Sequence, residues 1–250
     1  TSEIKKIFEN NHKISKEIIN AKYPIIILGH EILNLQSAKF IFDGFQSFLK
    51  DNNKINENWN SLNILNLNAS SVGSYDLQVL SNNNDTLDKL KSNFFDIIFL
   101  FGQDDLIFKK KNEFVIYIGS HGDRGAEIAD LILPSAAFTE QNGLYENLEG
   151  RMQECKKASY PIGEALEDWK IINLIQKKLG NKDSLSNFES SRKEIIKTIP
   201  NFTSLNELPT FKETQVSNSS ADFIKEDVNI RELDYFYSNS ISRSSKTMSE

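Results

Sequence analysis

Short apolar runs recur through the first half of the chain, and each ends at a glycine, a proline or a polar loop. They lie at 25–29, 62–67, 96–102, 114–119 and 130–134. Runs of this length, rich in β-branched and aromatic residues, are typical of strands buried on both faces. Helical periodicity appears before and between them, at 1–22, 36–50 and 85–92. Strands that alternate with helices indicate right-handed crossovers, so we expect an α/β fold with a Rossmann-like parallel sheet flanked by helices.

The second half of the chain has a different pattern. Residues 135–165 are loop-like, and helical spacing returns at 166–180 and 184–198. After Pro200 the chain is so rich in Ser, Asn and Thr that it would not fold alone. We therefore expect an N-terminal helix, an α/β domain, a loop and helical extension, and an extended C-terminal tail that packs on neighbours through aromatic anchors. The four parts span 1–22, 23–135, 136–200 and 201–250, and the anchors are Phe223, Tyr235, Phe236 and Tyr237.

Composition narrows the possible functions. A net charge of −6 argues against a nucleic-acid-binding surface, which needs a basic footprint. No apolar run approaches the ~18 residues that span a bilayer, so we expect no direct membrane insertion. The single cysteine, Cys155, cannot form an internal disulfide or hold an iron–sulfur cluster, which takes about four thiolates. His12, His30 and His121 lie far apart without metal-ligand spacing, so we expect no metal site.

The glycines of 119–125 follow a predicted strand, as those of a dinucleotide-binding turn do. Their spacing is G-x-x-G-x-x-G rather than G-x-G-x-x-G. The next segment has only about nine residues before Pro134, too few for the usual crossover helix of about 10–12. We therefore favour a tight turn in which the glycines adopt positive φ. A nicotinamide-binding module is the alternative, and it predicts affinity for NADH.

Candidate catalytic groups are few. His121 and Asp123 lie two apart on the same turn, and Ser120 beside them lacks the nucleophile-elbow pattern. We expect a histidine that hydrogen-bonds to the backbone, and no catalytic residue. A charged stretch follows the last predicted strand, where we favour ion pairing and loop ordering, with an arginine as bidentate donor, over acid/base chemistry. The stretch contains Glu140, Glu146, Glu149 and Arg151.

Residues 129–153 contain an ordered block: A-D-x-x-L-P, then a glutamate, then N-x-E-G-R-x-Q. This block closely resembles a signature of the molybdopterin oxidoreductase superfamily. The matching positions are Ala129, Asp130, Leu133, Pro134, Glu140, Asn147, Glu149, Gly150, Arg151 and Gln153. The resemblance implies a molybdopterin oxidoreductase-like α/β domain.

Within that superfamily, the chain resembles the large iron–sulfur subunits of NADH:ubiquinone oxidoreductase, respiratory complex I. Three further segments carry this resemblance: the His-Gly-Asp turn at 121–123, the helix start at 167–172, and the tail segment 234–248. In that family the clusters lie in a cysteine-rich N-terminal region that this sequence lacks. The resemblance therefore implies a C-terminal part, encoded separately or cut from a longer product. A first residue that is Thr1 rather than Met agrees with that expectation.

The resemblance also implies a molybdopterin-enzyme fold that has lost its cofactor. Ligands of open α/β sheets bind outside the carboxyl ends of the strands. We expect a vestigial, unoccupied cleft there. It would also contain His30, Asp104 and Asp105, and Arg124 is the one obvious candidate for binding a phosphate. The cleft residues are Gly29, Gly102, Gly119, His121, Gly122 and Asp123.

The function that this resemblance implies is that of a structural and assembly subunit of the peripheral arm of complex I, on the matrix side of the mitochondrial inner membrane. Its expected partners are other arm subunits, including the chain that bears the N-terminal iron–sulfur region. This chain is expected to hold no cofactor, and the clusters are expected in a partner chain or the missing N-terminal part. The alternative is a fragment of an active molybdopterin-dependent oxidoreductase that needs a partner chain.

Overall fold

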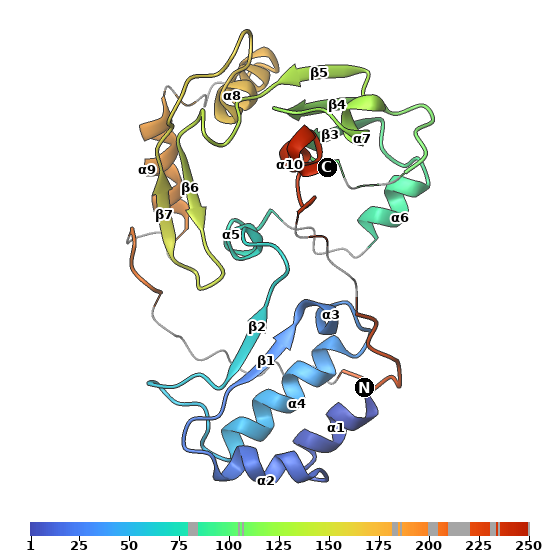
Figure 1. Ribbon diagram of the computed structural model, residues 1–250, viewed down its shortest axis with the longest axis vertical. Coiled ribbons are helices and arrows are strands. Elements are labelled where there is room, and N and C mark those ends of the chain that lie inside the picture. The colour runs from blue at the N-terminus through green and yellow to red at the C-terminus, as the bar shows by residue number, and fades with distance from the viewer. Residues whose placement is uncertain are drawn as a thin grey trace. The chain divides into compact units, whose positions relative to one another are not determined.

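The structure is a computed structural model that describes residues 1–79, 85–104, 106, 108–181, 185, 187–199, 205–209, 221–230, 234 and 236–249. The chain forms two compact units (Figure 1). Unit 1 consists of Thr1–Val72, Asn147–Arg151 and Leu208–Glu232. Unit 2 consists of Gly73–Glu146, Met152–Glu207 and Leu233–Glu250. The predicted anchor Tyr235 lies outside the described residues.

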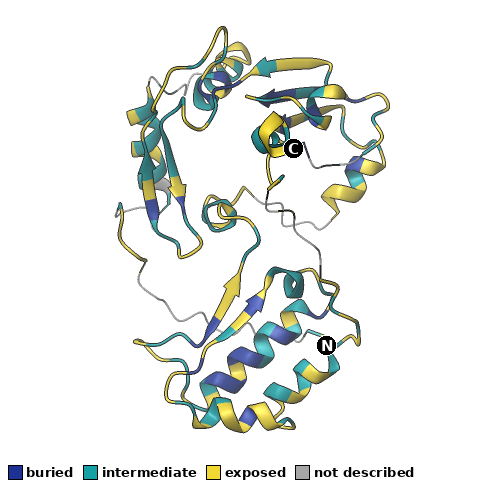
Figure 2. Ribbon diagram, in the orientation of Figure 1, coloured by how far each residue is buried: buried dark blue, intermediate teal, exposed yellow. Residues whose placement is uncertain are grey.

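Unit 1 packs helices against a two-stranded parallel sheet. Its elements are α1 (Ser2–Phe8), α2 (Lys13–Asn20), β1 (Ile26–Gly29), α3 (His30–Leu33), α4 (Ala38–Asp51) and β2 (Leu62–Leu65). The apolar stripe of α4 is buried against the strands, as its periodicity predicts, and Figure 2 shows this stripe in dark blue. The core consists of Leu28, Ile41, Phe45, Phe48, Leu49 and Leu62.

The single helix expected over 1–22 is wrong, because the segment forms two helices. The chain turns between them at Asn10, whose φ of 62° lies in the left-handed region. The Nδ1 atom of His12 then accepts a hydrogen bond from the backbone N–H of Ile14 at 3.2 Å, and so caps α2. A helix stop of this kind depends on a local side-chain contact that apolar periodicity does not report.

Unit 2 contains a three-stranded parallel sheet in the order β3-β4-β5. Its strands are β3 (Ile97–Phe101), β4 (Phe114–Gly119) and β5 (Leu131–Pro134), with α5 (Ser71–Asp76) and α6 (Thr86–Lys91) before them and α7 (Arg124–Glu127) between β4 and β5. One side of the sheet is covered by the segment around α7, where Ala126 and Ile128 pack against Val115 and Tyr117. α7 is one turn long, which confirms that no full crossover helix follows the glycine turn.

The rest of unit 2 is a hairpin with helices. It consists of β6 (Gly143–Glu146), β7 (Met152–Cys155), α8 (Asp168–Lys178), α9 (Phe188–Thr198), α10 (Ser240–Arg243) and α11 (Lys246–Ser249). The loop expected over 135–165 is therefore wrong in part, because β6 and β7 pair antiparallel. Only Glu146 and Met152 of the hairpin strands are buried, so there was little apolar alternation to reveal them.

The α/β class with parallel sheets is confirmed, but the strands do not form one described sheet. β1 pairs with β2 in unit 1, and β3, β4 and β5 pair in unit 2. An alternation of strands and helices predicts parallel pairing, which is observed, but it does not specify which strands share a sheet. Among the described residues, no helix is long and apolar enough to cross a membrane.

The described parts of the tail lie on this chain itself. In unit 1, the ring of Phe223 packs 5.4 Å from that of Phe40, and Glu226 accepts a hydrogen bond from the backbone N–H of Ser37 at 2.9 Å. In unit 2, the capping box of Asn239 starts α10. Contacts of the tail with neighbouring subunits stay a prediction.

Candidate functional site

The carboxyl ends of β3 and β4 form the candidate site in unit 2. Tyr117 of β4 is 1% exposed and lies beneath the glycine turn. Its hydroxyl donates a hydrogen bond to the carbonyl oxygen of His121 at 2.6 Å and lies 3.3 Å from Oδ2 of Asp104. Burial, with the nearby carboxylate of Asp104 second, raises the pKa of Tyr117 to about 12. The phenol therefore stays protonated and fixes the turn above it.

The glycines of the turn are required for close packing. A Cβ atom on Gly119 would lie 2.5 Å from the hydroxyl of Tyr117, and one on Gly125 would lie 2.4 Å from the carbonyl oxygen of Gln103. The expectation that these glycines adopt positive φ is wrong, since that conformation occurs at the neighbouring strand end, in Gly102 with φ of 56°. The turn is tight because a large ring fills the space below it.

Two carboxylates and one guanidinium meet beside this turn. Arg243 of α10 donates from Nε to Oδ2 of Asp123 at 2.5 Å, and its Nη2 lies 3.7 Å from Oδ2 of Asp104. Asp104 is 3% exposed, so its charge is almost removed from water. The hydrogen bond from Arg243 is the main cause that lowers the pKa of Asp123. The carboxyl ends of β3 and β4 therefore hold an ion-pair cluster within unit 2.

His121 does not form the backbone hydrogen bond expected of its side chain. Its Nδ1 lies 3.1 Å from the hydroxyl of Ser120 in an exposed position, and the backbone contact is made by its own carbonyl group instead. Asp123, its imagined catalytic partner, is held by Arg243. Among the residues described at this turn, we find no hydrogen-bonded pair of nucleophile and base.

The structure brings most of the predicted cleft residues together, with some exceptions. Unit 2 contains Gly102, Gly119, His121, Gly122 and Asp123, whereas unit 1 contains Gly29 and His30. Gly122 is exposed, with Ala126 near it. Asp105 lies outside the described residues, and Arg124 is exposed at the start of α7.

Signature residues near β5 order the backbone. Asp130 accepts hydrogen bonds from the backbone N–H of Val115 at 2.8 Å and from Nζ of Lys110 at 2.6 Å, and the lysine contact is the main cause that lowers its pKa. The carbonyl oxygen of Pro134 accepts from the N–H of Leu166 at 3.2 Å. These contacts fix both ends of β5.

The other signature residues shape the loop and the hairpin turn. Oε2 of Glu140 accepts from the N–H of Ala137 at 3.0 Å. Oδ1 of Asn147 accepts from the N–H groups of Glu149 and Arg151 at 2.9 and 3.0 Å. Gly150 has a φ of 78°, which this turn requires, while Gln153 is exposed on β7, paired with Tyr145. Loop ordering by Glu140 is thus observed, and a bidentate role for Arg151 stays a prediction.

Sequence reasoning missed a polar cluster where α8 begins. Asp168 accepts hydrogen bonds from the hydroxyl of Ser135 at 2.5 Å and from Nε2 of Gln141 at 3.0 Å. The buried carboxylate of Glu167 accepts from Nε1 of Trp169 at 2.8 Å. The E-D-W-K run at 167–170 was the available signal, since it carries part of the family resemblance. These contacts hold the start of α8.

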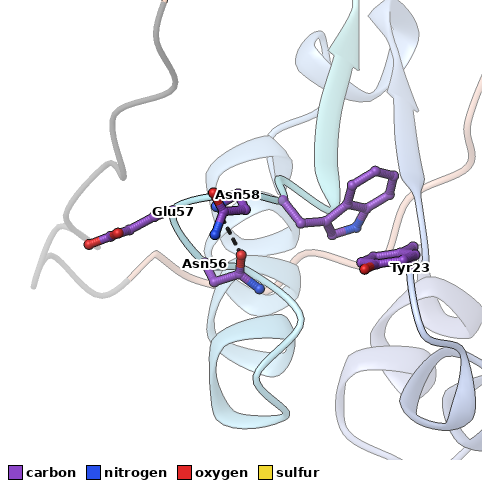
Figure 3. Close-up of a pocket in the computed structure, with 5 residues that line it drawn as sticks. Tyr23, Asn56, Glu57 and Asn58 are labelled. Carbon is purple, nitrogen blue, oxygen red and sulfur yellow. Dashed lines mark hydrogen bonds between the residues drawn. The ribbon is translucent and has the colours of Figure 1, made fainter.

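Each unit also has a hollow. In unit 1 a hollow of about 660 Å³ is lined by Tyr23, Asn56, Glu57, Asn58 and Trp59, and the two aromatic rings lie 5.0 Å apart (Figure 3). In unit 2 an apolar hollow of about 400 Å³ lies between β5 and α8. Among the described residues, no group of three or more His, Cys, Asp or Glu could hold a metal ion.

The fold and the signature contacts agree with the comparisons to known proteins. The chain belongs to the molybdopterin oxidoreductase family, because the sequence model of that family matches residues 1–178. More particularly, it is 35% identical over 240 residues to the G subunit of NADH-quinone oxidoreductase from Rickettsia bellii, an alignment that covers 96% of this chain and 34% of that one. It is 34% identical over 258 residues to the NADH-ubiquinone oxidoreductase 75 kDa subunit of Reclinomonas americana, an alignment that covers 100% of this chain and 37% of that one.

A third relative is NADH dehydrogenase [ubiquinone] iron-sulfur protein 1, mitochondrial, of Solanum tuberosum. It is 34% identical over 203 residues, which make up 80% of this chain and 27% of that one. The chain thus spans about a third of the length of these relatives. The family resemblance expected from the block at 129–153 is confirmed.

Proposed function

We propose that this chain is a structural and assembly subunit of the peripheral arm of respiratory complex I, and that it carries no redox centre of its own. The observation that carries the proposal is the similarity, over 96% and 100% of the chain, to proteins named as the G subunit of NADH-quinone oxidoreductase and as the 75 kDa subunit of NADH-ubiquinone oxidoreductase. In this proposal the chain supports electron transfer from NADH to ubiquinone by holding other subunits in place.

An exposed apolar surface on the unit 2 sheet supports a docking role. Ile97, Phe99 and Phe101 point to the same side of β3 and are 56, 44 and 50% exposed. Phe114, the partner of Ile97 in register, is 46% exposed. Removing such a surface from water is favourable. We propose that other arm subunits cover it, among them the polypeptide that bears the N-terminal iron–sulfur region.

The charges at the strand ends support the proposal that no pterin cofactor is held here. The phosphates of a pterin dinucleotide need N–H donors or cations. Asp104 and Asp123 place two carboxylates at these strand ends, and the guanidinium of Arg243 is already engaged with both. These residues do not fit a phosphate-bearing group. The iron–sulfur clusters of the arm are proposed to lie in a partner chain or in the N-terminal part that the relatives have, since this sequence has one cysteine.

The proposed location is the matrix side of the mitochondrial inner membrane. The relative from Solanum tuberosum is named as mitochondrial. The proposal places the chain there through its contacts with arm subunits.

Purification of the native assembly through an affinity tag on this chain tests the proposal. We expect the chain to co-migrate with cluster-bearing subunits in one large complex that oxidises NADH. Iron and molybdenum analysis of the chain, separated from that complex, should find neither metal. A chain that runs alone, without cluster-bearing partners, would contradict the proposal.

The second candidate is a fragment of an active molybdopterin oxidoreductase, which the family match over 1–178 favours. It predicts pterin released by denaturing the purified complex, and reductase turnover that depends on this chain. A nicotinamide-binding module predicts instead that NADH fluorescence changes on titration with the isolated chain. Either result would contradict the structural proposal and would favour the alternative that predicts it.

A further inference from the structure

At the carboxyl ends of β3 and β4, the guanidinium group of Arg243 contacts two carboxylates of the body of unit 2 and one carbonyl group of its own tail segment. Nε of Arg243 donates to Asp123 at 2.5 Å, Nη2 lies 3.7 Å from Asp104, and Nη1 donates to the carbonyl oxygen of Tyr237 at 3.1 Å. An ammonium group is a compact point charge without this planar fork. The arrangement is therefore selective for a guanidinium over other cations of the same charge.

The two carboxylates that contact Arg243 belong to the body of unit 2 and not to the C-terminal tail. Asp104 follows β3, Tyr117 lies in β4, and Asp123 follows β4, whereas Arg243 comes 120 residues after Asp123. The side chain of Asp104 has no exposed area, and its Oδ1 atom has no hydrogen-bond partner. A buried carboxylate without a cation is costly. The body of unit 2 thus presents a site that requires a positive ligand.

We propose that the cluster of Asp104 and Asp123 is a guanidinium-binding site, that Arg243 is its resident ligand, and that its occupation attaches the C-terminal segment to unit 2. The site takes an arginine side chain or a free guanidinium cation when the segment is withdrawn, and it repels phosphate. This inference concerns unit 2 alone and does not depend on the proposed membership of complex I. It gives a physical reason why a crevice at the usual nucleotide position of the fold would bind no nucleotide.

The test uses the full chain with Arg243→Ala and methylguanidinium as the probe. The variant should bind methylguanidinium at millimolar concentration in a saturable way, seen as a rise in Tm, while the wild-type chain should show no saturable rise because its site is filled. Backbone amides of α10 should exchange hydrogen roughly tenfold faster in the variant, the factor that corresponds to one lost charge-assisted bond. Methylguanidinium should not slow this exchange again, because a free cation that fills the site is not covalently attached to α10.

Two controls make the result specific. Arg192→Ala removes another partly exposed arginine of unit 2, paired with Glu154 at 3.6 Å, and should create no methylguanidinium site. Tetramethylammonium and inorganic phosphate should leave the Tm of Arg243→Ala unchanged. Equal responses of both arginine variants to methylguanidinium, or saturable binding of phosphate, would overturn the proposal.

A second pair of variants covers the case in which Arg243→Ala does not fold. Asp104→Asn together with Arg243→Ala removes the buried charge along with its ligand, so the double variant should fold and bind no methylguanidinium. Arg243→Lys should retain a cation but lose two of the three donor positions, so its α10 amides should exchange faster than those of the wild-type chain. A lysine variant that protects α10 as well as arginine would contradict the guanidinium selectivity.

Discussion

The two units bury their parallel sheets in different ways. In unit 1 the 14-residue helix α4 supplies a continuous apolar stripe, and Ile41 and Leu49 are completely buried. In unit 2 the one-turn helix α7 covers one side of the sheet, and polar contacts such as those of Asp130 tie the strands together. The comparison teaches that the same strand pattern can be stabilised by a long helix or by short segments with specific hydrogen bonds.

The largest expected effect is the loss of unfolding free energy when a buried ring of unit 1 is removed, compared with the loss for an exposed ring of unit 2. Phe45→Ala removes a ring that is 4% exposed and lies 5.2 Å from the ring of Phe8, so unit 1 should lose about 3–5 kcal/mol of unfolding free energy. Phe99→Ala removes a ring of unit 2 that is 44% exposed and should cost less than about 1 kcal/mol in the isolated chain. Urea unfolding followed by hydrogen exchange in each unit measures both values. Similar losses for the two variants would mean that the contrast between the sheets is wrong.

The glycines that end β1 and β4 give the next largest contrast. Gly119→Ala would place Cβ 2.5 Å from the hydroxyl of buried Tyr117, and should cost about 1–3 kcal/mol through overpacking. Gly29→Ala meets no atom within 4 Å and should change stability by less than about 0.5 kcal/mol. Thermal unfolding of the two variants provides the comparison. An alanine tolerated equally well at both positions would show that the turn does not depend on the ring beneath it.

A smaller effect is expected at Glu146, where burial, and then the carboxylate of Asp76, raise the pKa to about 7. Between the usual glutamate pKa and this value, the unfolded chain releases a proton that the folded chain keeps, so stability falls as pH rises through this range. Glu146→Gln should remove that decline. Since water screens part of the effect, we expect a gain of about 1–2 kcal/mol at pH 8 and almost none at pH 4. Unfolding curves at the two pH values check the sign, and a gain at pH 4 alone would contradict it.

The smallest expected effect is a loss of stability of unit 2 at low pH. The pKa values of Asp123 and Asp130 are lowered chiefly by hydrogen bonds from Arg243 and Lys110. Stability from these carboxylates is present above the usual aspartate pKa and is lost as pH falls through the lowered values. Hydrogen exchange in β4 should accelerate over that window, and Asp130→Asn should make the acceleration shallower. Unit 1, followed in the same samples, serves as the internal reference.

Much of the fold could be predicted because local patterns determine it. The stripe of Ile41, Phe45 and Leu49 indicates a helix whatever surrounds it, and the apolar runs of β1 to β5 indicate strands. The hairpin of β6 and β7 could not be predicted, since each strand has only four residues and only Glu146 and Met152 among them are buried. α5 was hidden by its Ser- and Gly-rich composition, which is typical of loops. The partition into two sheets depends on long-range packing that periodicity does not contain.

The candidate site was predicted in position but not in chemistry. Gly102, Gly119 and Asp123 could be placed at strand ends because each follows an apolar run. The reason for glycine at 119 could not be predicted, because the ring of Tyr117 reaches it only in the folded sheet. Arg243 is so distant in sequence from the turn that no motif spacing links them. Long-range ion pairs of this kind leave no local signature.

The apolar surface formed by Ile97, Phe99, Phe101 and Phe114, when left uncovered, would also limit how much of this chain a cell can hold in excess. Newly made copies that have not yet found a cover for it are targets for chaperones, self-association and degradation. Under the proposed function, surplus copies would be removed by these routes. The abundance of the chain would then follow the abundance of the subunits that cover this surface. Protein quality control would set the ratio of the chain to those subunits, without a dedicated regulator.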